Sequence, residues 1–265
     1  MAAEKSIFEE LAPYAKMVVV PGVTVGNLTY SNQQDLYSTS VFSTGATGII
    51  AANQQLQFFN GALGESAITQ GYTGGILSLS QTNSKFARGQ APANQVYIAT
   101  HAGFQLSQIS DTNLNNAHRE SLLVGLAETD SNVSDVFSVA NNFSWNLTIG
   151  RGITRSIGTF QEYPAPGVWA FQDDGVRDPG SIDPPVAPSN TGSNVFAQLG
   201  TPLACLKKLE VPIIFPPLVN VSIEAQCGSF IQLQQVINSA GLGAGAINVQ
   251  VKMIMRGYLM TMPVG

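Results

Sequence analysis

The sequence predicts an all-β protein, built as an antiparallel sandwich of two sheets. Four segments alternate apolar and polar residues with a period of two, as strands with one buried face do. The chain has 26 glycines and 14 prolines, and these cluster between such segments, where turns are needed. Hydrophobic residues make up 44% of the 265 residues, which is enough for the core of one large β domain.

The four strongest strand candidates are residues 95–107, 142–149, 219–226 and 247–260. In each of them one set of alternate positions is mainly apolar and the other mainly polar, so one face should enter a core. The residues expected on the core faces are Val96, Ile98, Thr100, Ala102, Phe104 and Leu106, then Phe143, Trp145, Leu147 and Ile149, then Val219, Val221, Ile223 and Ala225, and last Val249, Val251, Met253, Met255 and Leu259.

Four weaker candidates bring the expected number of strands to eight. They are residues 36–42, 55–59, 153–160 and 208–215. Two further stretches, 16–30 and 76–82, are strand candidates outside this main set.

Two segments have the spacing of helices. Residues 6–17 begin with Ser6 and Glu9, which form a capping box, and Pro13 keeps the expected helix short. Residues 229–240 place Phe230, Leu233, Val236 and Ile237 at helical spacing, and we expect these four side chains to face inward.

The expected organisation is an N-terminal arm over residues 1–34 and one domain over 35–265. The arm either packs on its own chain or docks on a neighbouring subunit or a membrane, and Phe8 and Leu11 would make that contact. Inside the domain, residues 161–206 form a long loop rich in Pro, Gly, Asp and Ser. A loop of that length is usually functional or part of an interface.

Charge is unusually scarce. Charged residues make up 11% of the chain, against about 25% in ordinary soluble domains. A surface of neutral polar groups is cheap to desolvate, which suits a protein that associates with copies of itself; a secreted β-sandwich with a neutral surface is the alternative. The net charge is −5 and the only adjacent basic pair is Lys207 with Lys208, so we expect no strong direct binding of nucleic acid.

Targeting and cross-linking signals are weak. The first 17 residues carry mixed charge without an apolar centre, so no signal peptide is predicted, and no apolar run reaches the length of a membrane span. Cys205 and Cys227 make neither a disulfide framework nor a metal set, and we expect free, buried thiols. The acidic loop over residues 173–183 lacks the spacing of an EF-hand, so a solvated turn is expected, with calcium at a subunit contact as the alternative.

The sequence predicts no catalytic, cofactor or metal site. His101 falls on an outward strand face and His118 in a polar loop, and neither has an acidic residue at a spacing that would orient it. The glycine-rich stretch 241–245 leads into a strand, whereas a phosphate-binding loop opens a helix. We therefore expect a protein that is not an enzyme.

Eight antiparallel strands with mixed turns and long loops fit a jelly roll. Four passages resemble the major capsid proteins of tailless icosahedral viruses, especially those that infect bacteria. They are LQFFNGALGE at 56–65, TNSKFARGQAPANQVYIATHAGFQL at 82–106, LEVPIIFPPLVNVSIEA at 209–225 and INVQVKMIMRGYLM at 247–260. The count of eight strands favours a single jelly roll over a double one, which needs about sixteen.

The resemblance implies a structural coat protein. Such a subunit is made in the host cytoplasm, forms trimers or other symmetric capsomers, and tiles the shell of a virion. Its partners would be copies of itself, other virion proteins or an internal membrane. The resemblance carries over no catalytic residue and no cofactor.

A carbohydrate-binding β-sandwich is the rival interpretation. Tyr163, Trp169 and Phe171 lie close together in the long loop and would offer an aromatic platform for a sugar. The same three side chains would equally serve as anchors in the interface with a neighbouring subunit, because aromatic residues are enriched at the centres of interfaces.

Overall fold

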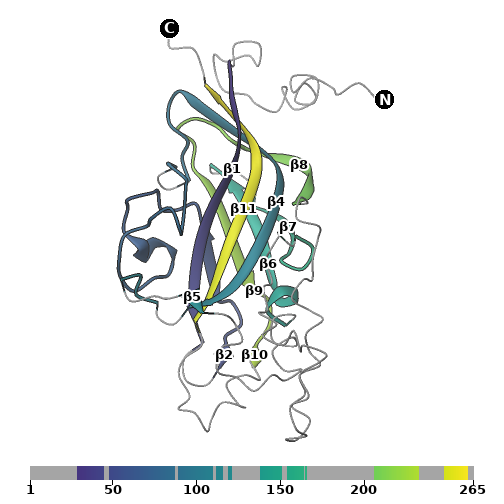
Figure 1. Ribbon diagram of the computed structural model, residues 1–265. Coiled ribbons are helices and arrows are strands. Elements are labelled where there is room, and N and C mark those ends of the chain that lie inside the picture. Colours follow the sequence, from purple (N-terminus) through teal and green to yellow (C-terminus); the bar gives the residue numbers. More distant parts are fainter. Residues whose placement is uncertain are drawn as a thin grey trace, which may run out of the picture.

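All eight segments predicted as main strands form strands, and they pair antiparallel in two sheets (Figure 1). The computed structural model describes residues 29–44, 48–86, 89–109, 112–115, 119–120, 138–150, 154–163, 165, 206–232 and 248–261. Within these ranges the only helical segments are the 3-10 turn η2 (Ala67–Gln70) and a single turn over residues 138–142. The predicted all-β, antiparallel class is therefore confirmed.

The first sheet contains the longest strands. β1 (Thr29–Ser43) pairs with β11 (Asn248–Thr261), and β11 pairs with β4 (Gln95–Ile109). One part of β4 then pairs with β8 (Lys207–Phe215) and its last residues with the short β5 (Arg119–Glu120). The order of the long strands is thus β1-β11-β4-β8, although β1 and β11 stand at opposite ends of the described chain.

The second sheet has the order β3-β9-β6-β7. Its strands are β3 (Gln55–Phe58), β9 (Val221–Cys227), β6 (Phe143–Ile149) and β7 (Arg155–Thr159). A separate two-stranded ribbon of β2 (Ile49–Ile50) and β10 (Ile231–Gln232) lies beyond the sheets at one end of the sandwich (Figure 1).

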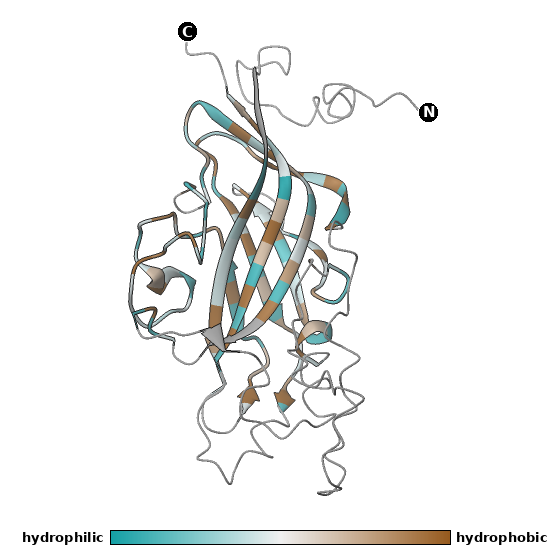
Figure 2. Cartoon of the chain, in the orientation of Figure 1, coloured by the Kyte–Doolittle hydropathy of each residue, from teal (hydrophilic) through white to brown (hydrophobic). Residues whose placement is uncertain are grey.

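Aromatic side chains join the two sheets. The ring of Phe104 from β4 meets Trp145 of β6 edge to face at 5.4 Å between centroids, and it meets Phe58 of β3 at 5.7 Å. Phe42 of β1 stacks on Phe143 of β6 at 5.4 Å. The alternation of apolar and polar residues along the strands is visible in Figure 2 and follows from this arrangement, because only one face of each strand meets the opposite sheet.

One predicted core face is wrong in the first half of β4. Tyr97 and Ala99 join the core with Ala102 and Phe104, whereas Val96 and Ile98 are buried on the other face of the sheet. The reason is a bulge: Gly257 of β11 pairs with Ala99 and Arg256 pairs with His101, so Thr100 is an extra residue that reverses the alternation. The periodicity of the sequence does not reveal where a bulge reverses the alternation.

Other expectations fail at the ends of elements. Residues 76–82 do not form a continuous strand, because a turn over 79–81 lies between isolated bridges at Ile76 and Thr82. Ile231 and Gln232 belong to β10 and Phe230 is mostly exposed, so the helix predicted from residue 229 does not begin there. Ile149 is the last residue of β6 and Val219 precedes β9, and both are partly exposed.

Several predicted segments lie outside the described residues. These are the helix over 6–17, most of the candidate strand 16–30, residues 233–240, and the long loop 161–206 except for residues 161–163, 165 and 206. The predicted boundary between residues 34 and 35 falls inside β1, which begins at Thr29.

Candidate interaction surfaces

A well-packed segment between two strands lies beside β1, at the left of Figure 1. We call residues 61–83, between β3 and β4, the wing. The wing folds back on itself: the amide of Gly64 donates to the carbonyl of Leu77 at 2.8 Å, and the amide of Leu77 donates to the carbonyl of Glu65 at 2.9 Å. Its inner side has a small core of its own, in which Ala67, Tyr72 and Leu77 pack on Val41.

The wing closes the outer edge of β1. The amide of Thr39 donates to the carbonyl of Gln81 at 2.9 Å, and the amide of Tyr37 donates to the side-chain oxygen of Asn83 at 2.8 Å. The Asn83 amide group donates in turn to the carbonyl of Asp35 at 2.7 Å. An open strand edge is a template for unwanted pairing with another chain, and here it is occupied over residues 35–39.

A buried polar contact also ties the wing to the sheet. The hydroxyl of Tyr72 lies 2.9 Å from that of Thr39 on β1 and accepts a hydrogen bond from the side chain of Gln250 on β11 at 2.8 Å. Burial raises the pKa of Tyr72 despite these two bonds, because the phenolate would lose its hydration. The wing is therefore attached to two strands by backbone, apolar and polar contacts together.

The exposed side chains of the wing are apolar or neutral polar, with a single charged exception. Leu63, Ile68, Ile76 and Leu79 expose 38%, 64%, 66% and 63% of their surface. The only charged side chain of the wing is Glu65, whose carboxylate accepts a hydrogen bond from the amide of Ala62 at 2.8 Å. Exposed apolar side chains concentrated on an ordered element mark a contact surface.

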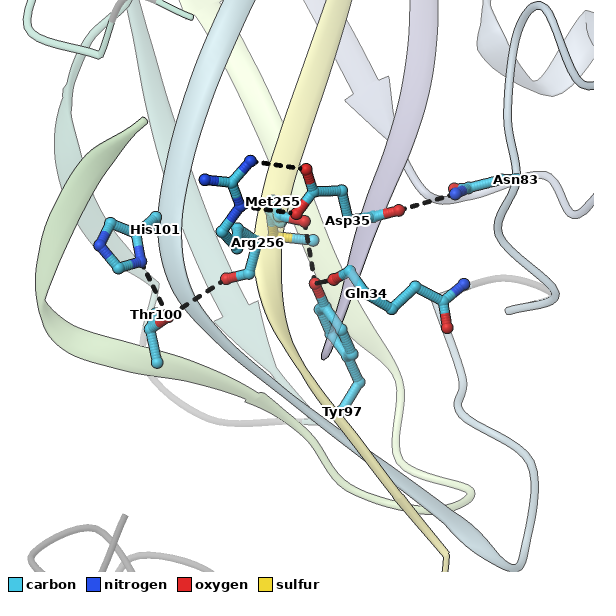
Figure 3. A network of polar contacts seen from close by, with 8 residues as sticks. All are labelled: Gln34, Asp35, Asn83, Tyr97, Thr100, His101, Met255 and Arg256. Carbon is cyan, nitrogen blue, oxygen red and sulfur yellow. Dashed lines mark hydrogen bonds and ion pairs between the residues drawn. The ribbon is translucent and has the colours of Figure 1, made fainter. Parts of the chain in front are cut away.

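A second candidate surface is the polar face of the first sheet, shown in Figure 3. A row of paired residues crosses four strands: Asp35 of β1, Arg256 of β11, His101 of β4 and Lys208 of β8. Arg256 makes two bonds of 2.9 Å to the carboxylate of Asp35. Both side chains are substantially exposed, at 35% and 41%, so this ion pair contributes little stability.

The bulge residues join this row to the core. The Thr100 hydroxyl lies 2.9 Å from Nδ1 of His101 and donates to the carbonyl of Arg256 at 3.3 Å. Close by, the hydroxyl of Tyr97 lies 2.8 Å from the carbonyl oxygen of Gln34 and 2.9 Å from that of Met255 (Figure 3). His101 is thus hydrogen-bonded on an outward strand face, as predicted, and the network ties strands together around the bulge.

Tyr163 does not have the exposed position that we predicted. Its side chain is 5% exposed and meets Trp145 edge to face at 5.2 Å, while the ammonium group of Lys207 lies 4.3 Å from its ring centre. Its backbone also pairs with β4, because the amide of Phe104 donates to the carbonyl of Tyr163 at 2.8 Å. The ring therefore packs within its own chain, and the other predicted interface residues, Trp169, Phe171, Phe8 and Leu11, lie outside the described residues.

The described part of the chain contains no group of three or more His, Cys, Asp or Glu side chains that could hold a metal ion. No helix in that part is long and apolar enough to cross a membrane. Cys227 is free and buried, and burial raises the pKa of its thiol. Cys205, His118 and the acidic loop over residues 173–183 lie outside the described ranges.

Comparison of the chain with protein-family models, with curated proteins and with solved structures found no match. Function is therefore inferred from the strand order and the composition of the chain. The wing was not predicted from the sequence, although one signal for it is present: residues 61–83 include several aliphatic residues and a single charged one.

Proposed function

We propose that this chain is a single jelly-roll coat subunit, which assembles with copies of itself into symmetric capsomers and a closed virus shell. The observation that carries the proposal is the pairing order of the eight main strands. The first pairs with the eighth (β1 with β11), the second with the seventh (β3 with β9), the third with the sixth (β4 with β8) and the fourth with the fifth (β6 with β7).

This nested pairing is what results when one long antiparallel hairpin is rolled into a sandwich of two four-stranded sheets. The pairing order supports a jelly roll, a fold that is common in viral capsid and lectin domains. A single roll accounts for all eight main strands, so no second roll is needed to explain the described residues.

The composition supports the coat function over a binding module. With 11% charged residues the surface is cheap to desolvate, as repeated contacts between copies require. A ligand cavity inside the sandwich would need polar groups that converge there. Here the described interior is filled by packed rings, among them Phe58, Phe104 and Trp145.

We further infer that the subunit resides in the virion and is made in the host cytoplasm. Because the chain has a net charge of −5 and no run of basic residues, the genome would be held by another component, either a second virion protein or an internal membrane.

The deciding experiment measures the size of the assemblies formed by the purified protein, by analytical sedimentation with negative-stain microscopy. We expect stable capsomers that associate into closed shells as protein concentration or salt is raised. A strict monomer or dimer at every concentration, salt and pH would contradict the coat function. A glycan-binding screen would then test the sugar-binding alternative.

A further inference from the structure

We infer that the wing is the surface through which one copy of the subunit contacts the next. The inference rests on the proposed coat function and specifies which part of the sandwich does the assembling. The wing presents Ile68, Ile76 and Leu79 at 63% to 66% exposure on a segment whose backbone is bonded to β1.

Rigidity is the first argument. An exposed apolar side chain on a mobile loop loses conformational freedom when it binds, and this cost weakens the contact. The backbone of the wing is held by hydrogen bonds to β1 and by a small core of its own, so less of this cost remains. Gly71, with φ of +86°, lies so close to β1 that an added Cβ would be 2.2 Å from the carbonyl oxygen of Val41. The hydroxyl of Tyr37 also donates to the carbonyl of Leu79.

Charge identifies the partner as a second copy of this chain. Two copies each carry a net charge of −5 and repel one another, so they meet most favourably through a surface with little charge. The wing is such a surface, because Glu65 is the only charged residue among residues 61–83. A nucleic acid would require basic groups instead, and the wing has none.

The surroundings of the apolar residues also fit a protein contact. Ser66, Thr69, Thr73 and Ser80 are exposed on the same segment and offer hydroxyl groups that form hydrogen bonds without charge. A central apolar group with a neutral polar rim is the usual composition of an interface between proteins.

The test inserts one charge on the wing and one elsewhere. Ile76→Glu places a carboxylate at the most exposed of the four apolar side chains of the wing. Leu218→Glu is the matched control, because Leu218 is equally exposed, at 66%, and lies in the turn between β8 and β9. Assembly of the full chain is followed by sedimentation over a concentration series, and the thermal unfolding of each variant is recorded beside it.

We expect Ile76→Glu to raise the concentration needed for assembly at least about tenfold, as removal of an interface anchor does, and Leu218→Glu to leave it near that of the wild type. If Ile76→Glu lowers the unfolding temperature, the neutral variant Leu79→Ser is used for the same comparison. Unchanged assembly in the wing variants, or an equal loss in Leu218→Glu, would overturn the wing contact while the coat function stands. A wild-type chain that never associates would overturn both.

Discussion

Trp145 gives the sharpest test of the core. Its side chain is fully buried in β6 and meets the rings of Phe104 and Tyr163 edge to face at 5.4 and 5.2 Å. Replacing a buried Trp by Ala costs about 3–5 kcal/mol through lost transfer energy and the cavity that remains. This range sets the scale for Trp145→Ala.

Two corrections to that range act in opposite directions. The two edge-to-face contacts add about 0.5–1.5 kcal/mol each beyond area burial. Against this, the indole N–H of Trp145 is buried with no hydrogen-bond partner among the described residues, and removing an unpaired donor recovers about 1–3 kcal/mol. Because these amounts are similar, we expect Trp145→Ala to lower the free energy of unfolding by about 4 kcal/mol.

The assay is urea unfolding of each variant, followed by far-ultraviolet circular dichroism at one protein concentration. Trp145→Phe keeps a ring and removes the unpaired N–H, so it should cost less than half as much as Trp145→Ala. Ile149→Ala on the same strand is the control, because Ile149 is more than a third exposed and should cost less than about 1 kcal/mol. A cost below about 1 kcal/mol for Trp145→Ala, or equal costs for the two Trp145 variants, would refute this account of the core.

Three further predictions concern the wing and the polar face. Gly71→Ala should destabilise the chain by about 2 kcal/mol or more, because φ is +86° and the new Cβ would meet the carbonyl of Val41; a normal thermal midpoint would show that the wing can shift. Asp35→Asn should cost only about 0.2–1 kcal/mol, since its bond to Arg256 is exposed, and the cost should shrink in high salt when urea unfolding is compared at two ionic strengths. Burial, and then the negative charge of Asp35, raise the pKa of Tyr97, so the unfolded chain loses this proton first once the pH passes about 10. Stability that is present below that pH should therefore fall by up to about 1.4 kcal/mol per pH unit above it, and Tyr97→Phe should flatten the decline in an alkaline urea series.

The strands were predictable because their signal is local. In β6 and β9 the alternation of apolar and polar residues matches the observed burial nearly residue by residue. Successive side chains of a strand point to opposite faces, so the sequence pattern and the burial pattern have the same period. The antiparallel all-β class follows from the same pattern. The low charge of the chain is likewise a property of composition alone, and it indicates a surface suited to association through neutral groups.

The candidate contact surface was less predictable. Residues 76–82 have the composition of a strand, yet they form only isolated bridges, Ile76 with Ser66 and Thr82 with Ser38, on either side of a turn. Tyr163 belongs to a residue type that is common among interface anchors. Its ring, however, is in contact with Trp145 and Lys207, which come from distant parts of the chain.

The sequence by itself determined which segments become strands, which side of most strands faces the core, and that the surface carries little charge. These properties depend on composition and on the order of neighbouring residues. The tertiary structure alone decided the nested pairing of β1 with β11 and β3 with β9, the bulge at Thr100, and the docking of the wing on the β1 edge. Each of these depends on which backbone groups from distant segments meet, and a period-two pattern is the same whatever strand lies beside it.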